Sequence, residues 1–315
     1  MNYRRLGQTD LRVSEYGFGA WGIGGDSYGP VERADALSAL SVAEELGCNL
    51  VDTAAVYGES EAIIGEFLKG RRDRWILASK YSFQKEGLEK TLEQQLRRLD
   101  TDFIDFYQLH AAPPQTDEVY RQLERLKASG KVRYLGVSLY SADSIRQVLS
   151  DDRIDGFQVA FNLVDVQPCR QCQPEIAAAG KGVLIRSSLK SGLLTGKYAP
   201  GVRFDPQRDH RARDMTADEI DRTLRWLESF RFLEQTEGSL LQAAARYPLA
   251  FDSTSSVLLG ARSAEQARIN FGEIPARPLS PESLQRIEDT QRRLGIGRVN
   301  PLRRWAGRML RSLRG

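Results

Sequence analysis

Four polar residues follow apolar runs in the first third of the sequence. Asp52 ends the run NLVD, Lys80 follows WILAS, and His110 follows DFIDFYQL. Tyr57 lies five residues after Asp52, in the segment DTAAVYGES. An ionisable group directly after an apolar run is costly unless it has a partner. The pattern therefore favours a shared site that carries out proton chemistry.

Each of the four residues, taken alone, also has an ordinary structural explanation. Asp52 could cap a helix, and Lys80 could be a solvated strand end. Tyr57 could be an aromatic residue at a rim, and His110 could be a hydrogen-bonded core histidine. Their occurrence on neighbouring strands, at the same end of each, is what favours a common role.

A tyrosine beside a lysine can act as a general acid. The pKa of a free phenol is about 10, and an adjacent ammonium stabilises the phenolate. We therefore expect Lys80 to lower the pKa of Tyr57 toward the working range, with Asp52 holding Lys80 protonated and aimed. Tyr57 would then protonate a carbonyl oxygen while His110 donates a hydrogen bond to the same oxygen. No side chain donates hydride, so this chemistry implies a reduced cofactor.

The elements that must position these residues alternate along the chain. Strands are expected at residues 12–16, 49–52, 75–79, 102–109, 132–138, 156–160, 182–187 and 255–260, and helical patterns at 34–47, 60–68, 87–100, 118–130 and 141–150. The runs are apolar almost throughout, which is typical of parallel strands covered on both faces. Eight strands alternating with helices predict an α/β fold, a closed (β/α)8 TIM barrel. Working groups in such a barrel lie past the C-terminal ends of the strands.

A doubly wound sheet is the alternative fold, and its support is the stretch GFGAWG at residues 17–22. This stretch fits G-x-G-x-x-G, which binds a dinucleotide when a helix begins at once. Here the chain continues as IGGDSYGP, and no helical pattern begins before about Glu32. We therefore reject the dinucleotide-binding interpretation of this stretch.

Two additions to a bare barrel are expected. Residues 1–14 form two short runs around Gly-Gln-Thr-Asp, which predict an N-terminal β-hairpin. Residues 197–238 contain no strand pattern, only an arginine-rich loop and a helix over 219–235, so extra helices lie near the C-terminus. We expect one domain over residues 1–297, followed by a basic tail at 298–315 that could form a helix.

Composition limits the class of protein. The chain has 315 residues, 41% of them hydrophobic, with no apolar run long enough to span a membrane and no apolar signal region at its start. Its three cysteines suit a reducing compartment, so a cytoplasmic protein is expected. Cys169 and Cys172 form a CxxC pair, which we interpret as chance surface thiols because nothing completes a zinc site.

The charge of the chain is concentrated at one end. The net charge is +3, and residues 298–315 contain six arginines and no acid. The remainder is therefore slightly acidic, which argues against a nucleic-acid partner. A small-molecule carbonyl substrate is the expected partner, no metal is expected, and a monomer is the default.

Several motifs resemble a known family. VDTAAVYGESEAIIGEFL, ILASK, DFYQLH and the late GARSAEQARIN are similar to the signatures of the aldo-keto reductases, and the resemblance runs to about Gly272. It implies an NADP(H)-dependent oxidoreductase that reversibly reduces an aldehyde or ketone to an alcohol. It also implies that Asp52, Tyr57, Lys80 and His110 are the catalytic tetrad.

The resemblance further implies where NADP(H) binds. Ala20 and Trp21 would edge the nicotinamide and the substrate, and Ser138, Gln158 and Asn162 would hold the carboxamide. The segment after strand seven would hold the pyrophosphate and nearby groups through Ser187, Leu189, Gly192 and Leu193. Gly260 and Arg262 would lie at the 2′-phosphate, with Gln266 and Asn270 at the adenine.

One position departs from the family in a way that bears on the cofactor. Many relatives carry a tyrosine that stacks on the nicotinamide, and this chain carries Arg186 there. Arg186 could turn away toward a carboxylate or phosphate. Alternatively, it could stack on the ring and favour the uncharged NADPH over NADP⁺, because two cations in a partly buried site repel each other.

Two other functions remain as alternatives. The chain could be an NADP(H)-binding regulatory subunit with slow or no turnover. It could also be a barrel lyase that uses Lys80 as a Schiff base, although a neighbouring Asp52 argues for a protonated, non-nucleophilic amine.

Overall fold

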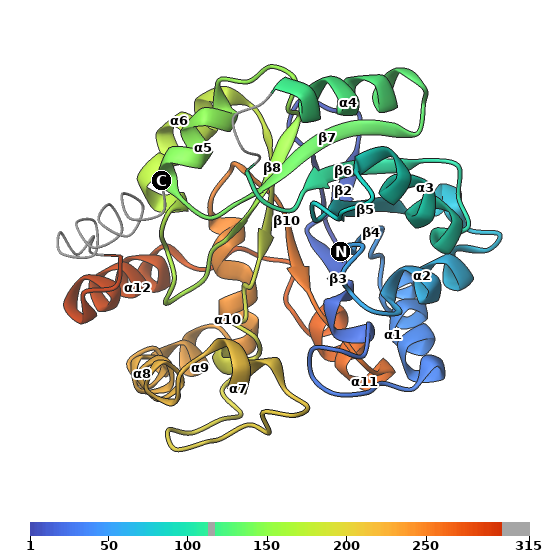
Figure 1. The fold of residues 1–315 in the computed structure, drawn as a ribbon. Helices are drawn as coiled ribbons and strands as arrows, with labels where there is room; N and C mark the ends of the chain where they lie inside the picture. The colour runs from blue at the N-terminus through green and yellow to red at the C-terminus, as the bar shows by residue number, and fades with distance from the viewer. Residues whose placement is uncertain (113–116, 298–315) are drawn as a thin grey trace, which may run out of the picture.

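The computed structural model describes residues 1–112 and 117–297, and its centre is a closed parallel barrel (Figure 1). The predicted TIM barrel is therefore confirmed, and the doubly wound sheet is excluded. Around the barrel the order is β10 (Thr254–Leu259), β3 (Tyr16–Gly19), β4 (Leu50–Asp52), β5 (Ile76–Tyr81), β6 (Ile104–Leu109), β7 (Val132–Leu139), β8 (Gly156–Ala160) and β9 (Gly182–Arg186).

The first predicted strand is wrong in its position. Residues 12–14 form β2 (Arg12–Ser14), which pairs antiparallel with β1 (Tyr3–Arg5) in the predicted N-terminal hairpin. The barrel strand β3 begins only at Tyr16 and includes the first glycines of GFGAWG. The rest of that stretch forms a short 3-10 turn, η1 (Ala20–Ile23), so no helix begins there that could receive a pyrophosphate.

The hairpin covers the N-terminal end of the barrel. Leu6, Leu11 and Val13 of the hairpin are buried in one apolar cluster with Phe106 of β6 and Leu184 of β9. Apolar side chains on one face of the hairpin thus remove the barrel interior from water at this end. The opposite end of the barrel, where the strands finish, is left for the loops.

The helices expected between the strands are present with small shifts at their ends. They are α1 (Arg33–Glu45), α2 (Ser60–Leu68), α3 (Leu88–Leu99), α4 (Asp117–Ala128) and α5 (Ala142–Leu149). Seven more were not placed or were placed only in part: α6 (Gln173–Ala179), α7 (His210–Asp214), α8 (Ala217–Glu228), α9 (Phe232–Thr236), α10 (Leu240–Arg246), α11 (Ala264–Ala267) and α12 (Pro281–Leu294).

The region after β9 follows its prediction in part. Residues 197–238 contain no strand, as expected, and Figure 1 shows α7, α8 and α9 grouped beside the barrel. The helix expected over 219–235 is two helices, α8 and α9, separated by a turn at Ser229–Arg231. Residues 298–315, the predicted basic tail, lie outside the described residues.

The interpretation of the CxxC pair as surface thiols is wrong. Cys169 and Cys172 begin and end the short turn η3 (Cys169–Cys172), and both are buried and free. Burial raises the pKa of Cys169 to about 12, so this thiol stays protonated at neutral pH. Among residues 1–112 and 117–297, no helix has the length and apolar character needed to cross a membrane.

Candidate active site

Asp52 and Lys80 form a buried ion pair at the C-terminal end of the barrel. Asp52 is the last residue of β4, and the neighbouring strand β5 places Lys80 beside it. The ammonium nitrogen of Lys80 lies 2.5 Å from Oδ2 of Asp52 and 2.8 Å from the carbonyl oxygen of Thr53. The Lys80 side chain is 0% exposed, so the alternative of a solvated strand end is wrong.

The other oxygen of Asp52 is held by two amides. Oδ1 accepts hydrogen bonds from Nε2 of Gln108 and from Nε2 of Gln158, each at 3.0 Å. Gln108 was not identified from the sequence, although an amide two residues before His110 in an apolar strand was a usable signal. These bonds fix the orientation of the carboxylate and direct its other oxygen at Lys80.

Tyr57 lies over this pair because two glycines bring its loop close to η1. A β-carbon on Gly24 would lie 2.1 Å from the carbonyl oxygen of Tyr57. A β-carbon on Gly58, whose φ is +49°, would lie 2.3 Å from the carbonyl oxygen of Gly24. Neither position tolerates a side chain without moving the backbone. The Lys80 ammonium then lies 5.0 Å from the centroid of the Tyr57 ring.

The expected fall in the pKa of Tyr57 is not observed. Burial raises the pKa of Tyr57 above its ordinary value, and the charge of Lys80 lowers it by less. For Lys80, burial favours the neutral amine, but Asp52 and Tyr57 outweigh it and raise the pKa of the ammonium. At neutral pH Tyr57 is therefore a phenol and Lys80 a cation.

His110 completes the group of four. Its ring centroid lies 5.8 Å from that of Tyr57, and its Nδ1 lies 2.6 Å from the hydroxyl oxygen of Ser82. Burial, together with the charge of Lys80, lowers the pKa of His110 to about 4, so the ring is neutral at neutral pH. In the tautomer where Ser82 donates to Nδ1, Nε2 of His110 carries a hydrogen that it can donate.

The residues expected to hold a carboxamide are only partly available. The hydroxyl of Ser138 is buried and has no hydrogen-bond partner among the described residues, as a donor or acceptor awaiting a ligand would be. Gln158 already donates to Asp52. Asn162 donates to the carbonyl oxygen of Ser187, and its side-chain oxygen accepts from the backbone of Val164 and Asp165.

Arg186 ends β9 with its guanidinium over the ring of Tyr140, 4.4 Å from the ring centroid. It forms no ion pair among the described residues, and its buried Nε has no partner there. The guanidinium does not turn toward a carboxylate, which was one of its two expected positions. The charge of Arg186 still acts on the candidate active site, because it contributes to the lowered pKa of His110.

The segment after β9 has an unusual backbone. Ser187, Lys190 and Ser191 have positive φ angles of 56°, 44° and 54°, and Gly192 follows with 83°. Successive residues of this kind can turn backbone N–H groups toward an anion. The N–H of Leu193 donates to the carbonyl of Lys190, so it is not free for the pyrophosphate as expected. Leu189 is partly buried against the core.

The residues expected at the 2′-phosphate and the adenine contact one another and residues 28–30 of the loop that follows η1. The Arg262 guanidinium donates to the carbonyl oxygens of Tyr28, Gly29 and Pro30, at 2.6–2.9 Å. The backbone N–H of Arg262 donates to Gln266. Asn270 donates to the carbonyl oxygen of Gly260. The Nη atoms of Arg262 therefore hold these carbonyls, whereas its buried Nε has no partner among the described residues.

Apolar side chains surround the mouth above Tyr57. Ala20 is buried, whereas Trp21 is exposed, with its ring centroid 6.3 Å from that of Tyr57. Val56, Phe83 and Tyr140, on the loops after β4, β5 and β7, are exposed as well. His210 of α7 packs its ring 4.3 Å from Trp21, a contact that nothing in the sequence pattern indicated.

The model of the Aldo/keto reductase family matches residues 15–292. This chain belongs to the aldo/keto reductase family. It is 30% identical over 306 residues to the uncharacterized oxidoreductase YqkF of Bacillus subtilis, covering 91% of this chain and 96% of that protein. It is 29% identical to a probable voltage-gated potassium channel subunit beta of Oryza sativa, covering 91% and 96%.

The family is also shown by solved structures. The glycerol dehydrogenase AKR11B4 of Gluconobacter oxydans superposes with a TM-score of 0.82 at 27% identity, covering 95% of this chain and 98% of that chain. This aldo/keto reductase is thus an oxidoreductase of the TIM-barrel type, and the resemblance drawn from its motifs is confirmed.

Proposed function

We propose that this aldo/keto reductase uses NADPH to reduce an aldehyde or ketone reversibly to an alcohol. The observation that supports it best is the ring of Tyr57 beside the buried ammonium of Lys80, which is paired with Asp52. When bound, a reduced nicotinamide would supply the hydride. Tyr57 supplies the proton, and the reaction yields the alcohol.

Tyr57 acts as the general acid. Its raised pKa keeps the proton on the hydroxyl at neutral pH, which is the state that reduction requires. When that proton leaves, the ammonium of Lys80 stabilises the phenolate, because the pair is enclosed and Asp52 keeps the lysine charged. Lys80 acts through this charge, so it is not the nucleophile of a lyase.

His110 orients the carbonyl group. A neutral imidazole whose Nδ1 is occupied by Ser82 can donate its Nε2 hydrogen to the same oxygen that receives the proton. Because its pKa is about 4, His110 does not compete with Tyr57 as an acid above that pH.

The residues fit a nicotinamide dinucleotide at several points. The unpartnered hydroxyl of Ser138 suits the carboxamide, the turn from Lys190 to Gly192 suits the pyrophosphate, and Arg262 suits the 2′-phosphate. Ala20 and Trp21 would adjoin the nicotinamide ring. The exposed apolar residues around the mouth favour a carbonyl compound with an apolar body.

The similarity to a probable channel subunit favours a second candidate, an NADP(H)-binding regulatory subunit with slow turnover. The two are separated by measuring NADPH consumption with a panel of aldehydes and ketones, together with NADPH affinity by fluorescence. We expect steady turnover, with kcat/KM varying across the panel. Tight binding of NADPH with no turnover on any member would support the regulatory subunit instead.

A further inference from the structure

The end of the barrel opposite Tyr57 carries a second polar site. A cavity of about 390 Å³ lies beside the hairpin, at the residues that lead into β4, β5, β6 and β7. Four arginines line it, Arg12, Arg72, Arg74 and Arg133, against three aspartates, Asp10, Asp73 and Asp105. The proposed reduction uses none of these residues.

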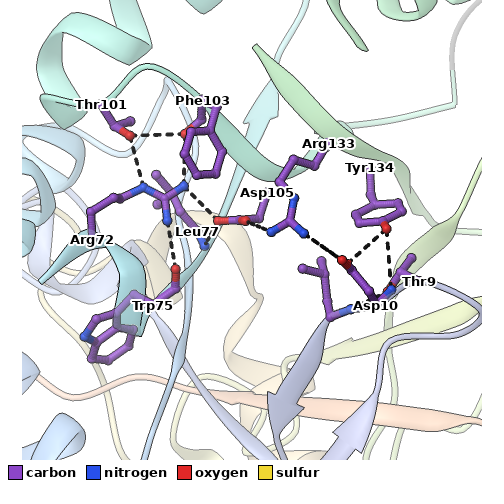
Figure 2. Close-up of polar contacts among 11 residues, drawn as sticks. Thr9, Asp10, Arg72, Trp75, Leu77, Thr101, Phe103, Asp105, Arg133 and Tyr134 are labelled. Atoms are coloured by element: carbon purple, nitrogen blue, oxygen red, sulfur yellow. Dashed lines mark hydrogen bonds and ion pairs between the residues drawn. The ribbon is translucent and has the colours of Figure 1, made fainter. Parts of the chain in front are cut away.

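Two of the arginines are fixed by a chain of ion pairs (Figure 2). Arg72 and Arg133 lie on either side of the buried Asp105, each with a nitrogen 2.7 Å from one of its oxygens. Arg133 also donates to both oxygens of Asp10 in the hairpin, at 3.0 Å, and the Tyr134 hydroxyl donates to Asp10 at the same distance. This series of ion pairs holds the hairpin against the barrel.

The Arg72 side chain is further immobilised. It donates to the hydroxyl of Thr101 and to the carbonyl oxygens of Trp75 and Phe103, and its guanidinium lies 4.3 Å from the centroid of the Phe103 ring. One wall of the cavity is therefore rigid, and its charges are neutralised. Asp105 is paired with both Arg72 and Arg133, and Asp10 is paired with Arg133.

Arg12 and Arg74 take no part in these ion pairs. Both side chains are exposed, and neither guanidinium group has a hydrogen bond or ion pair among the described residues. Arg12 comes from the hairpin strand β2, and Arg74 ends the short turn η2 (Arg72–Arg74), so separate segments bring the two guanidinium groups to one cavity. Asp73, also exposed and without a partner there, is the one carboxylate that remains.

We propose that this cavity binds a small molecule carrying a phosphate or carboxylate group, held between the guanidinium groups of Arg12 and Arg74. Guanidinium groups match the planar oxygens of such anions and form charge-assisted hydrogen bonds with them. Asp73 accepts a hydrogen bond from a hydroxyl of the same molecule. The cavity has the size of sites that hold small metabolites. A bound molecule bridges the hairpin and the barrel.

The test is chemical modification of arginine by phenylglyoxal in the full chain, with each site followed by mass spectrometry. Inorganic phosphate, glycerol 3-phosphate and succinate are the probes, and sodium chloride at equal ionic strength is the reference. We expect each binding probe to slow modification of Arg12 and Arg74 together. Arg97, an exposed residue of α3 with no side-chain partner among the described residues, is the internal control and keeps its rate.

A titration calorimetry experiment compares the wild type with Arg12→Gln/Arg74→Gln and with Arg97→Gln. The double variant is expected to bind the probe at least about 100-fold more weakly, because it loses two charge-assisted bonds that each contribute about tenfold, and Arg97→Gln to bind it normally. The variant Arg262→Gln is measured as well, because a phosphate that no longer binds to it was bound at the opposite end of the barrel.

Modification of Arg12 and Arg74 at the same rate with every probe as with sodium chloride would overturn the proposal. So would probe binding that only Arg262→Gln removes. Because the modification experiment uses the wild-type chain, a double variant that fails to fold does not prevent the decision. The result is independent of NADPH turnover, so failure here leaves the proposed function untouched.

Discussion

Lys80 lies with its ammonium 2.5 Å from Oδ2 of Asp52, and both side chains are almost fully buried. A buried charge that loses its partner is left without compensation, which typically costs about 3–5 kcal/mol. We expect Asp52→Asn to lower the free energy of unfolding by that order, measured by urea denaturation at pH 7.

Two controls accompany this variant. Asp52→Asn combined with Lys80→Met is expected to cost less than the sum of the two single changes, because neither charge is then left alone. Glu66→Gln removes one partner of the exposed pair with Arg33 and is expected to cost less than about 1 kcal/mol. Additive losses at Asp52 and Lys80 would show that the pair is not coupled.

The lowered pKa of His110 predicts a loss of stability in acid. Between pH 6.5 and about 4 the unfolded chain binds a proton at this histidine that the folded chain does not, so stability falls as the pH falls through this window. The variant His110→Asn lacks this proton uptake. We expect urea unfolding at pH 7 and pH 4.5 to show a smaller acid loss in the variant than in the wild type.

If the free energy of unfolding falls by the same amount between pH 7 and pH 4.5 in His110→Asn as in the wild type, another group is responsible for the fall. His210, whose pKa is also lowered by burial, is the obvious second group, and His210→Asn is the matched comparison.

A contact between Arg262 and the 2′-phosphate would make the protein bind NADPH more tightly than NADH. If Arg262 binds the 2′-phosphate, Arg262→Gln should weaken NADPH binding about tenfold through the loss of a charge-assisted contact. NADH lacks that phosphate, so its dissociation constant should hardly change. Fluorescence titration measures both, and an equal effect on the two cofactors would contradict an NADP site.

The charge of Arg186 predicts that the protein binds NADPH more tightly than NADP⁺. A cation near the nicotinamide disfavours the positively charged NADP⁺ by about 1 kcal/mol or more, which is about fivefold in affinity. We expect Arg186→Tyr to lower the ratio of NADPH affinity to NADP⁺ affinity by that factor. The same ratio in variant and wild type would reject the proposal that Arg186 acts on the ring.

The barrel could be predicted because its strands are short apolar runs that alternate with amphipathic helical segments in the sequence. The strand ends then bring Asp52, Lys80 and His110 together, since parallel strands finish at the same end. The first strand was misplaced because the hairpin strand β2 and the barrel strand β3 follow each other with only Glu15 between them, so the sequence shows no break. The pairing of Arg12 with Arg5 assigns residues 12–14 to the hairpin, whereas Tyr16 pairs with Val257 of β10, a contact between segments far apart in the sequence.

Other parts of the site depend on contacts across the fold. The approach of Gly24 to Tyr57 joins two loops, and no spacing in the sequence reveals it. The direction of the pKa shift of Tyr57 depends on how deeply the ring is packed, whereas the sequence shows only that a lysine is near. The bonds of Arg262 to residues 28–30 likewise join distant segments.

The proton donor is the centre of the proposed mechanism, and Tyr57→Phe removes only its hydroxyl. The decisive measurement is kcat/KM for the best carbonyl substrate in this variant, alongside the dissociation constant of NADPH. The mechanism predicts a loss of at least about 100-fold in kcat/KM, in line with the usual contribution of a general acid, with NADPH binding unchanged. Turnover within a few-fold of the wild type would contradict it.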